Sequence, residues 1–181
     1  MSGRRLPIVP VLVGALLGFI AGYFAAGGGR PSAAPAAGEA SASDGGGRIE
    51  ELQRSVDRDP ENPELLTALG NALYDREDWD RAIAAYEKAR RKAPDNANLL
   101  ADLGAAYRNR GEFKRAIALF EQARQKDPEH WQSLLNLVLV HAYDRKDPAA
   151  AQKWFDELKR RYPEIPDLDR IQQRISGLRV S

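Results

Sequence analysis

The chain has no cysteine and only two histidines among its 181 residues. Without a thiol it can form no disulfide, no thiolate metal site, no cysteine nucleophile and no bacterial lipoprotein anchor. The histidines, His130 and His141, are eleven positions apart on one predicted helix. About 16 Å of helix separates them, which is too far to share a metal. Phosphate-binding glycine loops, nucleophile elbows and zinc-ligand spacings are also missing. We therefore expect no enzyme, no metal and no cofactor.

An excess of one charge is missing as well. The chain carries 27 Lys+Arg and 26 Asp+Glu side chains. Three of the basic residues (Arg4, Arg5, Arg30) and two of the acidic residues (Glu39, Asp44) precede residue 48, which leaves 24 of each sign from Arg48 onward. A segment without net charge lacks the basic surface that nucleic acid requires, so we expect no nucleic-acid partner.

One long hydrophobic run is present. Leu6 to Ala26 is 21 residues without a charge. At about 1.5 Å per residue, a helix of this length spans about 30 Å, enough to cross a bilayer. Arg4 and Arg5 precede the run, so the positive-inside rule keeps the N-terminus in the cytoplasm. We predict a signal anchor over residues 1–26 in the inner (cytoplasmic) membrane of a bacterium, with the rest of the chain periplasmic or outside the cell. A cleaved signal peptide, cut near Ala26, is the alternative.

Three glycines, Gly14, Gly18 and Gly22, recur every four residues within this run. Such spacing puts them on one helix face, where a second helix can approach closely. The face favours self-association or docking to a membrane partner, although glycine is also common in membrane spans generally. Residues 27–47 are rich in Gly, Ala, Ser and Pro, which predicts a flexible linker with a reach of about 25 Å.

Two adjacent segments, residues 63–96 and 97–130, are the same 34-residue unit written twice. Fifteen of the 34 aligned positions are identical. The identical pairs include Leu66/Leu100, Leu69/Leu103, Gly70/Gly104, Ala82/Ala116, Ala89/Ala123 and Pro94/Pro128. A fixed period of this length indicates stacked structural repeats, which present a surface to other proteins and seldom carry out chemistry.

A third and more divergent unit covers residues 131–164. By the same 34-residue count, Ala150 and Trp154 take the places of Ala116 and Phe120 in its second helix. The departures from the pattern are Val138 at the glycine position, His141 at an aromatic position, Arg145 at the tight turn of Gly111, and a proline, Pro163, one place late.

The second unit reads Leu100-x2-Leu103-Gly104-x2-Tyr107, then Ala116-x3-Phe120, Ala123 and Pro128. This pattern resembles the tetratricopeptide repeat. The resemblance implies an all-α solenoid in which each unit is a pair of antiparallel helices. We expect Gly70 and Gly104 where paired helices cross, and Tyr86 and Phe120 in the space between successive units.

The ends of the stack and of its helices also carry signals. Residues 48–59 and 166–179 each have one apolar stripe, which predicts capping helices at the two ends of a repeat domain over residues 48–181. The domain should hold about eight helices. Asn62 and Asn96 precede the first helices of two units and are expected to cap them, and His130 stands at the same place in the third unit.

The resemblance further implies that the first helix of each unit lines a groove for a protein or peptide. The groove positions that it assigns are Thr67, Asn71, Tyr74, Asp75, Ala101, Arg108, Asn109, Leu135, Leu139 and Tyr143. Some family members hold a C-terminal carboxylate with a cationic and asparagine clamp, but only Asn71 matches such a place. For Leu135 and Leu139 two interpretations stay open: core positions covered by the chain itself, or an apolar groove for a partner helix.

These observations predict a membrane-tethered repeat scaffold that binds protein partners and supports assembly of an envelope complex. The layout of anchor, linker and few repeats is similar to periplasmic repeat domains of c-type cytochrome maturation. The alternative is a structural protein that oligomerises through the Gly14/Gly18/Gly22 face and through stacking of its repeats.

Overall fold

The computed structural model describes residues 45–178, which form eight α-helices and one short π-helix, with no strand among them. In chain order the elements are α2 (Gly45–Arg58), α3 (Pro63–Asp75), α4 (Trp79–Lys92), α5 (Ala97–Asn109), α6 (Phe113–Lys126), α7 (Trp131–Leu139), η1 (Val140–Asp144), α8 (Pro148–Arg161) and α9 (Leu168–Gly177). The predicted all-α class and the helix pairs are confirmed. The predicted anchor with Gly14, Gly18 and Gly22 lies outside the described residues. None of the helices from α2 to α9 has the length and hydrophobicity needed to span a bilayer.

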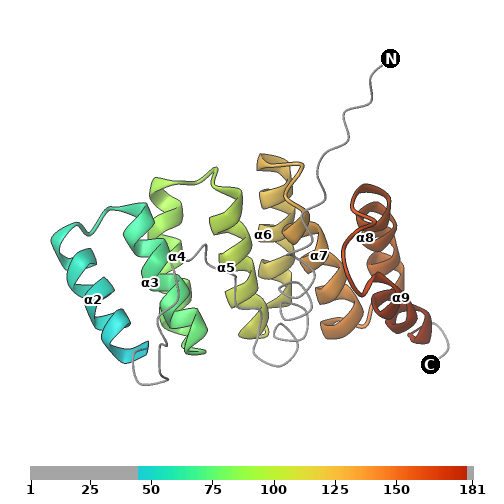
Figure 1. Ribbon diagram of the computed structural model, residues 1–181, viewed down its shortest axis with the longest axis horizontal. Coiled ribbons are helices and arrows are strands. Elements are labelled where there is room, and N and C mark those ends of the chain that lie inside the picture. The colour runs from blue at the N-terminus through green and yellow to red at the C-terminus, as the bar shows by residue number, and fades with distance from the viewer. Residues whose placement is uncertain (1–44, 179–181) are drawn as a thin grey trace, which may run out of the picture. The chain divides into compact units, whose positions relative to one another are not determined.

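The helices form a row of antiparallel hairpins, with each helix beside the next in the chain (Figure 1). The hairpins are α3 with α4, α5 with α6, and α7–η1 with α8. The first helices of successive hairpins also contact one another, α3 with α5 and α5 with α7. At the ends, α2 packs on α3 and α9 packs on α8 and η1. The helix α2 begins at Gly45, so it includes the last residues of the predicted linker.

The glycines of the first two units make room for an aromatic ring. A Cβ atom on Gly70 would lie 2.5 Å from the Tyr86 ring, and one on Gly104 would lie 2.7 Å from the Phe120 ring. Both rings are buried, since Tyr86 is 1% exposed and Phe120 is 0% exposed. We expected these rings between successive units, but the structure places each against the first helix of its own unit. The ring needs a partner without a side chain, which explains the glycine.

Side chains cap the first helix of every unit, as predicted. Oxygen Oδ1 of Asn62 accepts hydrogen bonds of 3.1 Å from two backbone N–H groups of α3, and Asn96 does so once for α5. In the third unit, Nδ1 of His130 accepts the backbone N–H of Ser133 at 3.3 Å. Because Nδ1 is the acceptor, the ring proton is on Nε2. The Nε2–H group donates a hydrogen bond to Asn98 Oδ1 at 3.1 Å. The imidazole therefore works as a helix cap and as a link between two units.

One additional residue is inserted in the third unit at η1. In the second unit, the backbone N–H of Glu112 bonds to the carbonyl of Tyr107, five residues earlier, at 2.8 Å. In the third unit, the N–H of Asp147 bonds to the carbonyl of His141, six residues earlier, at 2.9 Å. A single π-helical turn is the usual way to add one residue to a helix. The third unit is thus one residue longer than the other two.

The insertion changes which side chains enter the core. Ala151 and Phe155, exposed by 0% and 1%, take the places of Ala116 and Phe120. The expectation of Ala150 and Trp154 at these places was wrong, because it kept the 34-residue count. A shift of one residue rotates a helix by about 100°, which brings Phe155 inward and leaves Trp154 half-buried.

The tight turn moves by one residue for the same reason. Its left-handed position is Glu77 in the first unit with φ of 59°, Gly111 in the second with φ of 85°, and Lys146 in the third with φ of 52°. We expected Arg145 at this position, but its φ is −91°. The late proline, Pro163, follows from the same insertion.

A repeated ion pair follows the shifted count. In each unit the last basic residue of the second helix reaches back to an acidic residue in the loop before the unit. The pairs are Lys92–Glu61 at 2.7 Å, Lys126–Asp95, and Arg161–Glu129 at 2.6 Å. The first two pairs are related by a shift of 34 residues. In the third pair the glutamate follows Asp95 by 34 residues, but the arginine follows Lys126 by 35. These pairs are largely exposed, so each contributes little to stability, but they show that the units stack alike.

Candidate functional site

The ten groove residues predicted from the sequence lie on the first helices of the three hairpins. Asp75 is exposed. Thr67, Asn71, Arg108, Asn109 and Tyr143 are half-buried. Tyr74, Ala101, Leu135 and Leu139 are buried, with between 3% and 8% of each residue exposed. Since α5 contacts both α3 and α7, the three first helices lie side by side, and we call the side that carries these positions the first-helix face.

At the N-terminal end, this face is a set of hydrogen-bonded amides and hydroxyls. The Tyr86 hydroxyl donates to Asn71 Oδ1 at 2.7 Å, which joins α4 to α3. The Asn109 side-chain amide donates to the Tyr74 hydroxyl at 2.8 Å, which joins α5 to α3. The Tyr74 ring also meets the Trp79 ring edge-on, with 4.9 Å between centroids. These contacts hold the polar side chains in fixed positions before any partner arrives.

At the C-terminal end, the face is charged. Arg108 of α5 forms an ion pair with Asp144 of η1, and these side chains are 12% and 22% exposed. Beside this pair, the Arg174 guanidinium lies over the Tyr143 ring, 5.3 Å from its centroid. Burial raises the pKa of Tyr143, and the positive charges of Arg170, Arg174 and Arg108 oppose that rise. The tyrosine therefore keeps its hydroxyl proton at neutral pH.

The sequence reasoning missed the contribution of α9 to this face. It treated residues 166–179 only as a cap. Arg170 and Arg174 belong to α9, which begins 37 residues after α7, so neither the 34-residue period nor the 35-residue length of the third unit predicts which of its side chains lie beside η1.

Leu135 and Leu139 are 5% and 3% exposed. Such burial is typical of a core position. Tyr74 and Ala101 of the same face are also buried, so burial does not distinguish core from groove here. The assignment of these leucines to a partner groove therefore stays a prediction, and a charged substitution at Leu139 tests it.

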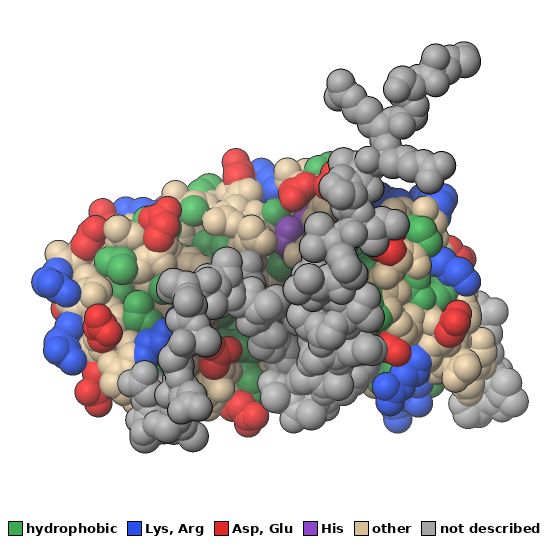
Figure 2. Space-filling view, in the orientation of Figure 1, with side chains coloured by type: hydrophobic (Ala, Val, Ile, Leu, Met, Phe, Trp, Pro, Cys, Tyr) green, Lys and Arg blue, Asp and Glu red, His purple; other side chains and the backbone are tan. Residues whose placement is uncertain are grey.

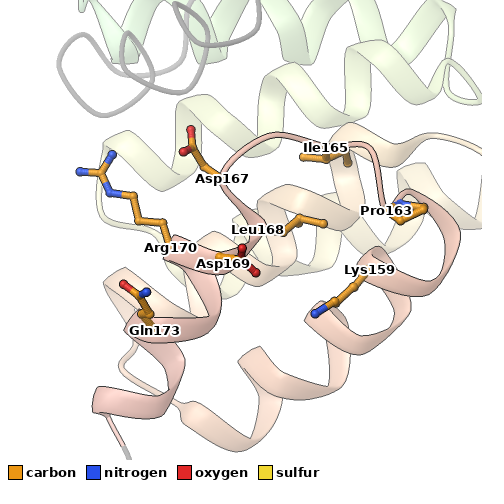
Figure 3. Close-up of a pocket in the computed structure, with 8 residues that line it drawn as sticks. All are labelled: Lys159, Pro163, Ile165, Asp167, Leu168, Asp169, Arg170 and Gln173. Atoms are coloured by element: carbon orange, nitrogen blue, oxygen red, sulfur yellow. The ribbon is translucent and has the colours of Figure 1, made fainter. Parts of the chain in front are cut away.

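Two shallow depressions lie beside α8, and Arg170 of α9 is among the residues that line the first. One of about 470 Å³ lies between α8 and α9, with Ile165 and Leu168 as its apolar floor and Lys159 and Asp167 at its rim (Figure 3). The other, of about 380 Å³, is lined by Trp154 and by side chains of α6. Neither has a nucleophile beside a base, and the described residues hold no group of His, Asp and Glu side chains that could bind a metal. Charged side chains of both signs are interspersed over the visible surface (Figure 2).

His141, the second histidine, is a core residue with an unsatisfied nitrogen. It is 9% exposed, and its Nδ1 is buried without a hydrogen-bond partner. The nearest carboxylate oxygen, on Asp147, is 3.9 Å away. Burial lowers the pKa of His141, and the negative charge of Asp147 partly offsets this effect. The imidazole is therefore neutral at pH 7 and packs in the third unit.

The comparison with known families agrees with the geometry. A family model described as Tetratricopeptide repeat matches residues 40–101, 73–137 and 109–175, three overlapping stretches that together cover most of the chain. No curated protein matches the sequence. Repeats of this kind act as protein-interaction scaffolds and are generally not catalytic. Because both the hairpins and the family model point the same way, the chain belongs to the tetratricopeptide repeat family.

Proposed function

We propose that this protein binds a protein or peptide partner on the first-helix face while its N-terminal segment holds it at a membrane. The observation that supports this proposal is the continuity of that face, since α5 contacts both α3 and α7. Asn71 of α3 and both Arg108 and Asn109 of α5 have fixed hydrogen-bond or ion-pair partners. A pre-organised surface loses little conformational entropy on binding, which favours affinity.

The face suits a helical or extended segment. Amide and hydroxyl groups of α3 and α5 match the polar groups of a peptide, and we assign Leu135 and Leu139 of α7 as spaced apolar anchors. Leu135 and Leu139 are four residues apart and therefore lie on one side of α7.

The substitution Leu139→Asp tests the proposal. We expect at least about tenfold weaker capture of partners from native membranes, with helix content by circular dichroism unchanged, because a charge replaces an apolar anchor. Ala118→Asp on α6 is the matched control, since Ala118 is exposed on a second helix. Loss of helicity in Leu139→Asp would assign the leucine to the core, and undiminished capture with intact helicity would refute the proposed face.

Membrane tethering rests on residues 6–26 of the sequence. A short anchor and a flexible linker would hold the repeats near membrane-bound partners and raise their effective concentration. This layout fits a protein that supports the assembly of an envelope complex. The specific pathway we propose is the maturation of c-type cytochromes.

The absence of cysteine makes the topology easy to test. Single substitutions Ser2→Cys and Ser181→Cys provide one thiol each in a background with none. In intact spheroplasts, a membrane-impermeant maleimide should label Ser181→Cys and leave Ser2→Cys unlabelled until lysis. Labelling of both without lysis, or release of the protein into the soluble fraction, would rule out the anchor.

Self-assembly is the second candidate, favoured by the regular spacing of Gly14, Gly18 and Gly22. Crosslinking in membranes should then give a ladder of homo-oligomers that is lost in Gly18→Leu. A monomer that is unchanged by the crosslinker would exclude this candidate.

A further inference from the structure

The first-helix face continues onto α9. The helix α9 follows α8 as the first helix of a next hairpin would, begins 37 residues after α7, and carries Arg170 and Arg174. The helix α9 contacts η1 as well as α8, which places it beside the C-terminal end of the face. In Figure 3 the Arg170 side chain extends from α9 away from Lys159 and Pro163.

One arginine packs on the Tyr143 ring at this end, and two others lie near enough for their charges to act on it. The Arg174 guanidinium carbon is 5.3 Å from the centroid of the Tyr143 ring. The charges of Arg170 and Arg108 also act on the Tyr143 hydroxyl. The three cations come from α5 and α9, whereas the tyrosine belongs to η1, so the fold brings together residues that are far apart in the sequence.

Among the described residues, the charged side chains that act on Tyr143 are arginines, while Asp167 and Asp169 lie with Arg170 in the depression between α8 and α9. Arg108 has the carboxylate of Asp144 as its partner. Arg170 is exposed and forms no ion pair with a described residue, and neither does Arg174. The Nε atom of Arg174 is buried without a hydrogen-bond acceptor.

We propose that Arg108, Arg170 and Arg174, grouped around Tyr143, bind the carboxylate side chains of an acidic segment in the partner. This inference rests on the proposed function, because it names the chemistry of the partner on the same face. Guanidinium groups bind carboxylates through two parallel hydrogen bonds. Their positive charge also attracts an acidic segment before contact.

The probe is a peptide of four Asp-Gly-Ser triplets, amidated at its C-terminus and labelled at its N-terminus with tetramethylrhodamine. Its neutral match replaces each Asp by Asn, and a third peptide is the neutral one with a free C-terminal carboxylate. Binding to the full chain in detergent micelles is measured by fluorescence anisotropy. We expect the acidic peptide to bind at least about tenfold tighter than the neutral one, and its affinity to fall as sodium chloride is raised.

The double variant Arg170→Gln/Arg174→Gln should bind the acidic peptide about tenfold more weakly. Lys88→Gln/Arg91→Gln is the control, since it removes the same charge from exposed positions of α4 and should change affinity less than about twofold. The single variant Arg170→Gln, at an exposed position, keeps the test valid if loss of Arg174 disturbs the fold.

Equal binding of the acidic and neutral peptides, or an equal loss in the control variant, would overturn the inference. Preference for the free C-terminal carboxylate would overturn it as well, since the site would then read a chain end. If partner capture from membranes depends on Leu139 while the acidic peptide does not bind, the inference fails and the proposed function stands. If Leu139→Asp leaves capture unchanged, the proposed function itself fails.

Discussion

At the scale of single residues, the hydrogen that serves as the side chain of Gly104 leaves room for the Phe120 ring. A Cβ atom there would lie 2.7 Å from that ring, closer than carbon atoms approach in proteins. Phe120 is fully buried and has no open space to move into. The glycine and the aromatic ring are therefore one structural unit, although they belong to different helices.

Gly104→Ala should lower the free energy of unfolding by about 1–3 kcal/mol, the usual cost of overpacking a core. Chemical denaturation followed by circular dichroism measures this change. Gly46→Ala on α2 is the control, because no atom lies within 4 Å of its added methyl group. Equal effects of the two substitutions would show that helix propensity, not the ring, governs the position.

The buried imidazole of His141 makes stability depend on pH. Burial lowers its pKa in the folded protein below the ordinary value of 6.5. As pH falls through that ordinary value, the unfolded chain takes up a proton before the folded chain does. Acidification below about pH 6.5 should therefore lower the free energy of unfolding.

His141→Gln removes this contribution, because glutamine does not titrate. Between about pH 6.5 and 5, the wild type should lose more stability than the variant, measured as the difference between their denaturation midpoints at each pH. The comparison cancels the carboxylates and His130, which both proteins share. Parallel curves for the two proteins would mean that the folded imidazole titrates normally.

At the scale of secondary-structure elements, the π-helix η1 sets the geometry of the third unit. Its additional residue moves the left-handed turn position to Lys146, whose φ is 52°. A non-glycine residue in this conformation costs about 1–2 kcal/mol. The second unit avoids that cost with Gly111.

Lys146→Gly should raise the free energy of unfolding by about 1 kcal/mol. Arg145→Gly, one residue earlier with φ of −91°, should lower it by about 0.5–1 kcal/mol, because there the glycine only adds flexibility to the unfolded chain. Thermal denaturation of the pair distinguishes the two positions. Stabilisation at Arg145 instead of Lys146 would refute the one-residue insertion.

Much of the fold could be predicted from the sequence, because the strongest signals are local. Asn62 and Asn96 predict where two helices begin. The pair of Gly104 and Phe120 in one unit recurs as Gly70 and Tyr86 in the other. The insertion could not be read in the same way. Three successive alanines, residues 149–151, allow the second helix of the third unit to be aligned in more than one register. Only Pro163 indicated the longer unit.

The candidate site was predicted less completely than the fold. The first-helix residues follow from the repeat period, and the structure places them on the first helices of the three hairpins. The contribution of Arg170 and Arg174 could not be predicted from that period, because α9 begins 37 residues after α7. Whether Leu139 is groove or core depends on what covers it, which a periodic pattern does not encode.

At the scale of the whole repeat domain, stability comes from contacts between neighbours. Each hairpin packs mainly on the next one, and α9 closes the C-terminal end through Ile171 and Ile175, which are 2% and 0% exposed. Stacks of this type unfold in parts, since no element contacts all the others.

Ile175→Asp should therefore release α9 and loosen the third unit more than the first. Hydrogen exchange followed by mass spectrometry should show faster exchange in α7 and α8, with α3 and α4 little changed. Gln173→Asp on the same helix is the control, because Gln173 is exposed. Uniform acceleration along the whole domain would indicate a single cooperative unit instead.

The π-helical turn also limits how this protein can be lengthened. A designer who fused consensus modules after Pro163 by counting multiples of 34 from Pro63 would join them one residue out of phase. Every grafted helix would then be rotated by about 100° and would turn the wrong side chains toward its neighbour. Modules joined at an offset of 35 for this unit alone should continue the superhelix, so the same short segment that breaks the period also defines where a working splice must fall.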